Sequence, residues 1–218
     1  TNLDALARLG DLGVTALLSD STNAEKAGHT TSEAEVAIAL REQIARAPFR
    51  VAVTTFASNI HRVQSIIDAA VAARRQVVLA GRSMQQNVQL ATERGYLTVP
   101  PNTLVPADKY DNLPRSAVCV LASGSQGERE GTMTRIAKGT HGDIRLEAGD
   151  WAILSSRKIP GNERAIGSVV NAFVKAGVEV IDDRAAAVHA SGHACNDEQR
   201  KVLELVRPRF FVPLHGEY

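Results

Sequence analysis

Histidines are few in this sequence, and the ones near its carboxyl end lie where they could do chemistry. Of the six histidines, His189 and His193 stand in the segment HASGHA and His215 stands in PLHGEY. The Ser-Gly turn of the first segment exposes two imidazoles and backbone amides to one small volume, which suits an anion. A histidine at a strand end followed by glycine, as at His215, is a reasonable metal ligand. A structural, hydrogen-bonded role for His193 remains the alternative.

The segment SGSQGE, residues Ser123–Glu128, is a second candidate for anion binding. Gly124 and Gly127 allow backbone N–H groups to face an anion, and the helix expected after them adds its dipole. The segment lacks the pattern G-x-G-x-x-G and no Walker lysine follows it. A tight turn with a helix cap explains the segment equally well.

Short apolar runs alternate along the chain with segments of 3.6-residue periodicity, and these elements must position the polar groups. Ser32 with Glu35 fits a capping box, and Asn196 or Asp197 is expected to cap the last helix. The chain opens in a helix-like stretch, TNLDALARLG. Strands are expected at Val14–Leu18, Arg50–Thr55, Gln76–Ala80, Ala117–Ala122, Trp151–Leu154, Val178–Ile181 and Phe210–Leu214. Further helices are expected at Glu33–Arg46, Ile60–Arg75, Met84–Arg94, Glu163–Lys175 and Asp197–Val206.

This alternation predicts an α/β fold with a mainly parallel sheet flanked by helices on both faces, of the Rossmann-like kind. In such sheets ligands collect at the carboxyl ends of the strands. Polar clusters follow nearly every expected strand and together predict a crevice able to hold phosphates: Ser19–Asn23, Phe56–Asn59, Gly81–Ser83, Ser123–Glu128, Ser155–Arg157 and His215–Glu217. The proline-rich stretch Leu97–Pro114 is expected to be a long irregular surface cover.

Composition sets limits on the class of protein. The net charge is +1, so positive potential for a polyanion must be local, and 44% hydrophobic residues suffice for an ordinary core. Cys119, in the run AVCVLA, is expected to be a buried thiol. The two lone cysteines indicate a reducing, cytoplasmic setting rather than a disulfide scaffold. No apolar run approaches the ~18–20 residues of a membrane span, so no membrane association is expected.

Taken together, a set of segments resembles the β-CASP region of the ribonuclease J family. They are LLSDSTNAEKAGHTTSE, TTFASNIHRVQ, AGRSM, ASGSQGE, SSRKIPGNE, VHASGHA and RPRFFVPLHGEY, in the family's order and over nearly the whole chain. The resemblance implies part of a metallo-β-lactamase/β-CASP nuclease that cuts RNA internally and degrades it 5′ to 3′, preferring a 5′-monophosphate. It also implies a cytoplasmic enzyme of bacterial mRNA decay and rRNA maturation, homodimeric or homotetrameric.

The resemblance also assigns roles to residues of three motifs. Asp20, in SDST, matches the acidic motif, His193 the second motif and His215 the third. His215 would ligate one of two divalent metals, zinc or manganese. His193 would contact the scissile phosphate and protonate the leaving 3′ oxygen, while Asp20 would accept a hydrogen bond from its ring. An imidazole with an ordinary pKa of ~6.5 can carry a proton at neutral pH, and a carboxylate partner fixes its tautomer.

A nucleotide pocket follows from the same resemblance. The hydroxyls of Ser58 and Ser191 and the amide of Gly192 would bind a terminal phosphate. A pocket closed behind one phosphate would favour a 5′-monophosphate over a triphosphate. Phe56 could stack on a base, but we interpret it as a core residue. The substrate-binding set is Ser58, Asn59, Ile60, His189, Ala190, Ser191, Gly192 and His193.

The sequence departs from the family in one respect. The family's H-x-H-x-D-H motif, its next histidine and its metal-bridging aspartate would all precede Thr1, so His215 is the one metal ligand left. We expect residues 1–30 to end a first metallo-β-lactamase segment, residues 31–185 to form the β-CASP domain, and residues 186–218 to return to the metallo-β-lactamase domain. The isolated chain is expected neither to hold two metals tightly nor to cleave RNA by itself.

Two other hypotheses stand beside the nuclease. A non-catalytic Rossmann-like module that binds a nucleotide explains the fold and the strand-end glycines equally well. It does not explain why HASGHA and PLHGEY lie together near the end, and the dinucleotide fingerprint is missing. An assembly or scaffold domain is the third hypothesis, and it predicts a large exposed apolar surface.

Overall fold

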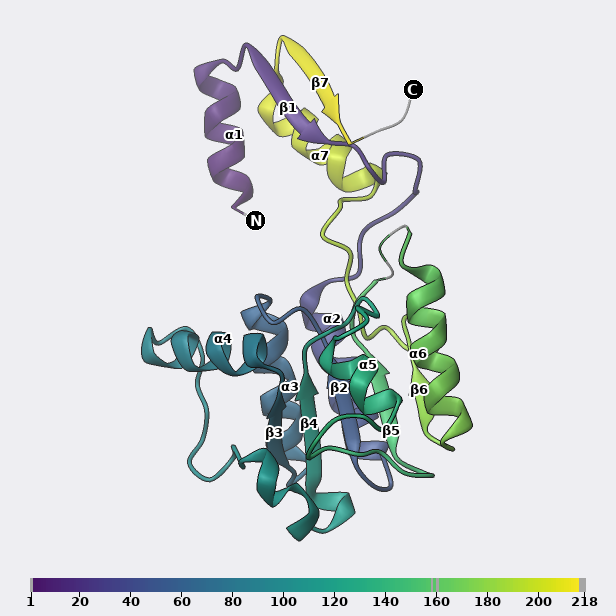
Figure 1. The fold of residues 1–218 in the computed structure, drawn as a ribbon. Helices are drawn as coiled ribbons and strands as arrows, with labels where there is room; N and C mark the ends of the chain where they lie inside the picture. Colours follow the sequence, from purple (N-terminus) through teal and green to yellow (C-terminus); the bar gives the residue numbers. More distant parts are fainter. Residues whose placement is uncertain (1, 158, 160, 216–218) are drawn as a thin grey trace. The chain divides into compact units, whose positions relative to one another are not determined.

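The computed structural model describes residues 2–157, 159 and 161–215, which fall into two compact units (Figure 1). Unit 1 combines the two ends of the chain, Thr1–Thr31 and Ser191–Tyr218, and unit 2 is the continuous segment Ser32–Ala190. Within the described residues, no helix is long and apolar enough to cross a membrane. The assignment of residues 1–30, 31–185 and 186–218 to domains of a larger enzyme stays a prediction.

Unit 2 is built on a five-stranded sheet in the order β3-β4-β2-β5-β6, in which every neighbouring pair is parallel. Helices join successive strands, as parallel pairing requires. The alternation of strands and helices in the sequence therefore predicted the fold class correctly. The strands are β2 (Val51–Thr54), β3 (Gln76–Ala80), β4 (Val118–Ala122), β5 (Trp151–Leu154) and β6 (Glu179–Ile181).

Helices cover both faces of this sheet, so that unit 2 has three layers (Figure 1). Successive strand residues point to opposite faces: Val53 and Leu121 join one buried cluster, whereas Ala52 and Val120 join the other. Both faces are apolar, which is why the strands read as continuous hydrophobic runs. On the first face lie α2 (Glu33–Arg46), α3 (Ile60–Ala72) and α4 (Arg82–Glu93); on the second lie α5 (Thr132–Ala137) and α6 (Glu163–Lys175).

Unit 1 is a parallel pair of strands with two helices. Strand β1 (Ala16–Asp20) pairs with β7 (Phe210–Leu214), and helix α1 (Leu3–Leu12) packs against α7 (Asn196–Val206). Gly10 allows the helices to approach, because a Cβ there would lie 2.2 Å from the carbonyl oxygen of Leu205. Strand β7 leaves apolar side chains exposed, as an assembly domain also would: Phe210, Phe211, Val212 and Leu214.

Some expectations about local structure need correction. The last helix is capped by Cys195, whose N–H donates to Glu198 at 2.9 Å, and not by Asn196 or Asp197. Strand β1 begins and ends two residues later than expected. The capping box of Ser32 and Glu35 is confirmed, and Cys119 is fully buried.

The proline-rich stretch Leu97–Pro114 is more ordered than a surface cover. It contains a 3-10 helix, Ala107–Asn112, in which Tyr110 is fully buried and donates from its hydroxyl to the carbonyl of Arg145 at 2.6 Å. Leu104 also forms a parallel bridge with Val77 of β3. The four prolines of the stretch indicate an irregular loop and obscured Tyr110, the one aromatic residue that anchors it in the core.

Leu121→Ala is expected to destabilise unit 2. Its side chain is fully buried in β4, and removing a buried leucine costs about 2–5 kcal/mol. Urea unfolding followed by the fluorescence of Trp151, the only tryptophan, measures this change. Leu90→Ala is the control, because Leu90 is 54% exposed and its loss should shift the free energy of unfolding by no more than about 0.5 kcal/mol. Equal shifts for the two variants would contradict the assigned core.

Candidate functional site

The pairing of β1 with β7 brings Asp20 next to the segment that carries His215. Asp20 is the last residue of β1 and pairs with Leu214. Directly after it, Ser21 donates to the carbonyl oxygen of Leu214 from both its N–H and its hydroxyl, each at 2.8 Å. His215 then adopts a φ of +59°, a left-handed conformation that is uncommon for residues other than glycine. The two strand ends are therefore fixed to each other at the site.

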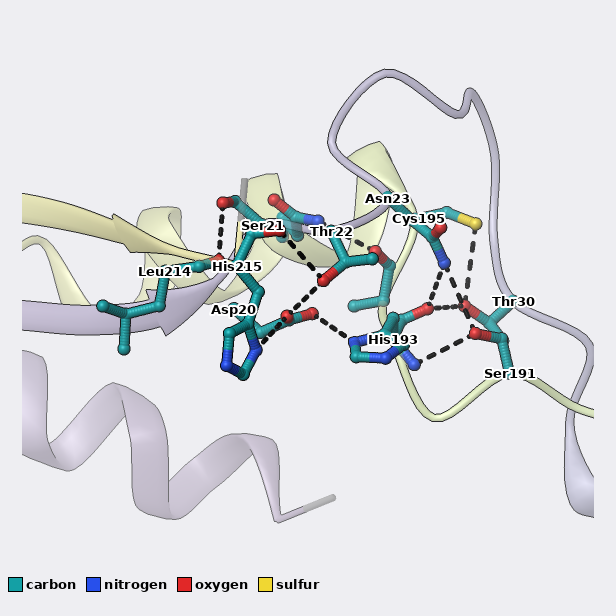
Figure 2. Close-up of polar contacts among 12 residues, drawn as sticks. Asp20, Ser21, Thr22, Asn23, Thr30, Ser191, His193, Cys195, Leu214 and His215 are labelled. Atoms are coloured by element: carbon teal, nitrogen blue, oxygen red, sulfur yellow. Dashed lines mark hydrogen bonds and ion pairs between the residues drawn. The ribbon is translucent and has the colours of Figure 1, made fainter. Parts of the chain in front are cut away.

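The carboxylate of Asp20 lies between two imidazole rings (Figure 2). Nδ1 of His193 is 3.0 Å from Oδ2 of Asp20, and Nδ1 of His215 is 3.4 Å from Oδ1. The contact expected between Asp20 and His193 is thus present, and His215 faces the same carboxylate. Asp20 is more than 170 positions from either histidine in the sequence, yet all three residues belong to unit 1.

A neighbouring hydroxyl keeps the Asp20 carboxylate ionised. Oγ1 of Thr22 donates to Oδ1 at 2.7 Å, and this hydrogen bond, followed by the one from His193, holds the pKa of Asp20 below its ordinary value against the opposing effect of burial. An ionised carboxylate only accepts hydrogen bonds. Nδ1 of His193 therefore carries the proton in this contact, and Nε2 is the nitrogen left to act on a substrate.

Backbone contacts hold His193 in place from both sides. Its N–H donates to Oγ of Ser191 at 3.1 Å, and its carbonyl oxygen accepts from Nδ2 of Asn23 at 2.8 Å. Asn23 is 3% exposed, so this amide is a fixed anchor. Sequence reasoning placed Asn23 in a polar strand-end cluster but gave it no role, because its partner lies 170 residues away.

Thr30 and Glu198 secure the base of the same loop. Oγ1 of Thr30 lies 2.6 Å from Oε2 of Glu198 and 3.2 Å from the carbonyl oxygen of His193, and its single proton goes to the shorter contact. The N–H groups of Thr30 and Cys195 donate to the same Glu198 oxygen, each at 2.9 Å. These hydrogen bonds, that of Thr30 above all, lower the pKa of Glu198. Neither residue was singled out from the sequence.

The residues expected to bind the nucleotide are divided between the two units. Ser191, Gly192 and His193 belong to unit 1, whereas Ser58–Ile60 and His189–Ala190 belong to unit 2. Asn59 begins helix α3 as its N-cap, because its Oδ1 accepts from the N–H of Arg62 at 3.1 Å. Phe56 is 42% exposed, so its interpretation as a core residue was wrong, and it is free of the packing that would prevent base stacking. A single pocket formed by both sets stays a prediction.

The described residues supply part of a metal site at most. They contain no group of three or more histidine, cysteine, aspartate or glutamate side chains that could hold a metal ion. His215 fits one ligand position, since a metal-binding histidine usually turns its other ring nitrogen to a carboxylate. Here Nδ1 faces Asp20, which makes Nε2 the nitrogen that would bind a metal.

Sequence comparisons show which known proteins this chain is similar to. Residues 48–173 match the family described as "Ribonuclease J, beta-CASP domain". Over the whole chain the sequence is 45% identical to ribonuclease J of Thermus thermophilus, 43% to that of Mycolicibacterium smegmatis and 41% to ribonuclease J 1 of Streptococcus pyogenes. The chain spans 38–39% of the length of these three relatives.

Thr22→Val is expected to raise the pKa of Asp20 toward its ordinary value, because the variant removes the hydroxyl that stabilises the charged carboxylate most. A lowered folded-state pKa adds stability above the unfolded pKa, and this stability is lost as pH falls through the folded pKa. The variant should therefore lose less stability in acid than the wild type. Carbon-13 NMR titration of the carboxyl group measures the shift.

Ser21→Ala is the matched control for this titration. Ser21 is the adjacent residue, and its hydroxyl donates to the Leu214 carbonyl instead of to Asp20. The titration of Asp20 should be unchanged in this variant. Identical titrations in Thr22→Val and the wild type would contradict the assigned role of the Thr22 hydroxyl.

Proposed function

Since the chain belongs to the β-CASP domain family of ribonuclease J, we propose that it is the RNA-gripping part of a bacterial ribonuclease. The complete enzyme would cleave RNA internally and degrade it from the 5′ end. The observation that supports this proposal most is the Asp20 carboxylate hydrogen-bonded to His193 and facing His215. The relatives are named ribonucleases, which makes RNA the expected substrate.

In this proposal His193 is the general acid. Asp20 accepts a hydrogen bond from Nδ1–H and orients the ring, so that Nε2–H faces the leaving 3′ oxygen of the RNA. As the P–O bond breaks, the Nε2 proton passes to that oxygen. The anchors at Asn23 and Ser191 hold the backbone of His193 during this transfer. The arrangement is the orienting part of a catalytic triad without its serine.

His215 would bind one of two divalent metals, zinc or manganese, whose other ligands lie outside this chain. Such metals, when bound, activate the attacking water and offset charge on the phosphate. Asp20 faces both imidazoles, so one carboxylate would orient the proton donor and the metal ligand together. This shared contact would keep a fixed distance between the two functions.

Within unit 2, the 5′ end of the RNA would bind at Ser58–Ile60 and His189–Ala190. Hydroxyl and amide donors there suit a monophosphate, and Phe56 is exposed enough to stack on a base. A preference for 5′-monophosphorylated single strands would place the enzyme in mRNA decay and rRNA maturation in the cytoplasm. The complete enzyme would be a homodimer or homotetramer.

Asp20→Asn and His193→Ala are each expected to lower kcat of the complete enzyme about 10²–10⁴-fold, the usual contribution of a positioned acid or base. The asparagine amide carries no negative charge to stabilise the protonated imidazole, and alanine has no proton to donate. Cleavage of a labelled oligoribonucleotide under single-turnover conditions measures the chemical step.

His141→Ala is the control for this experiment. Nδ1 of His141 accepts from the N–H groups of Asp143 and Ile144 in a turn of unit 2, so its role is local. Its kcat should stay close to that of the wild type. A normal rate for His193→Ala would remove the general-acid assignment.

The isolated chain of 218 residues is expected to show no RNA cleavage above background, because the described residues hold no complete metal site. Its dissociation constant for zinc should also lie within about threefold of that of the His215→Ala chain, since a single imidazole gives weak binding. Isothermal titration with zinc and a cleavage assay test both points. Cleavage that a chelator abolishes would contradict this expectation.

A further inference from the structure

Arg62 carries a charge in the interior of unit 2. Its side chain is 1% exposed although it lies on helix α3, and burial of an unpaired charge costs several kcal/mol. Such a residue needs hydrogen-bond partners for its guanidinium group. These partners identify the parts of the chain that Arg62 fixes.

The guanidinium of Arg62 contacts the chain on two sides. Nε and Nη2 donate to the two carboxylate oxygens of Glu33, at 2.8 and 2.7 Å, in a bidentate pair. Nη1 lies 2.8 Å from Oγ of Ser155 and 3.3 Å from the carbonyl oxygen of Val188. Oγ of Ser155 in turn donates to the Val188 carbonyl at 2.6 Å. Arg62 therefore fixes the Val188 carbonyl directly and through Ser155.

These partners lie at the two ends of unit 2. Glu33 is the second residue of the unit, and Val188 is followed only by His189 and Ala190 before the unit ends. Val188 is fully buried, so the peptide that leads into His189 is held rigidly. Nδ1 of His189 is buried and has no hydrogen-bond partner among the described residues, which is typical of an atom completed by a ligand or an ordered water.

We propose that Arg62 is a positioning residue for the 5′-phosphate pocket: it fixes the Val188–His189 peptide and thereby sets the place of the His189 ring against the first nucleotide. This inference rests on the proposed function and extends it to Arg62, a buried residue of the helix that begins at Ile60. Burial and then the charge of Arg62 lower the pKa of His189. The ring is accordingly neutral at neutral pH, with one nitrogen to donate and one to accept.

Lysine cannot replace Arg62 in this role. A single ammonium has neither the planar fork for Glu33 nor the reach to hold Ser155 and Val188 at the same time. Arg75 supplies a matched comparison in the same unit. It is also buried, at 5% exposed, and its Nη atoms donate only to backbone carbonyls, those of Ala47, Phe49 and Val118. Arg75 makes no contact with His189 among the described residues.

The test compares Arg62→Lys with Arg75→Lys in the complete enzyme. For Arg62→Lys we expect KM for a 5′-monophosphorylated oligoribonucleotide to rise about tenfold, with kcat within about threefold and KM for the 5′-hydroxyl form unchanged. Arg75→Lys should keep the wild-type ratio of the two KM values. Ser155→Ala removes only the hydroxyl that links Arg62 to Val188, so it should shift the ratio in the same direction by a smaller factor.

NMR of the complete enzyme with labelled histidine gives a readout that does not depend on cleavage. The ring signals of His189 should move in Arg62→Lys and stay in place in Arg75→Lys. Unmoved His189 signals in Arg62→Lys would overturn the positioning role whether or not the enzyme cleaves RNA. Moved signals with an unchanged KM ratio would overturn the link to the phosphate. A wild-type enzyme without ribonuclease activity would overturn the proposed function, and the His189 signals would still decide the positioning role.

Discussion

Parallel pairing of β1 with β7 is the interaction on which the candidate site depends. It sets Asp20 opposite Leu214, and the hydrogen bonds from Ser21 to Leu214 fix the register at the strand ends. A slip of one residue would turn the Asp20 side chain to the other face of the pair and away from both imidazoles. Parallel strands need a crossover connection. Here that connection contains the whole of unit 2, so unit 2 is an insertion in the sequence of unit 1.

The chain contains an exposed carboxylate–histidine pair and a buried ion pair, and the two have different roles. The side chains of His193 and Asp20 are 47% and 33% exposed, so their pairing adds little to stability, and the backbone contacts of Asn23 and Ser191 hold the imidazole instead. Arg62 is the opposite case, because its charge is buried and the loss of a partner would leave it uncompensated. A solvent-exposed pair can exchange protons with a substrate, whereas a buried ion pair keeps its geometry.

The sequence predicted those features that local patterns determine. Apolar runs predicted the bounds of β3, β5 and β7, and the histidine segments contain His193 and His215 of the candidate site. Arg62 and Asn23 could not be identified in this way, because a buried polar residue depends on partners far along the chain. The interpretation of Phe56 as a core residue was wrong for the same reason: its apolar character predicts burial, and only the three-dimensional arrangement shows that its side chain is exposed. The burial of Tyr110 was not predicted, because the prolines around it indicate an irregular loop.

The discontinuity of unit 1 has a consequence for biosynthesis. The amino end of a chain leaves the ribosome first, and a continuous segment such as Ser32–Ala190 can fold as soon as it has emerged. Strand β1 must wait throughout that time, since β7 follows the whole of unit 2 in the sequence. Asp20 therefore meets His193 and His215 only after the whole of unit 2 has been synthesised.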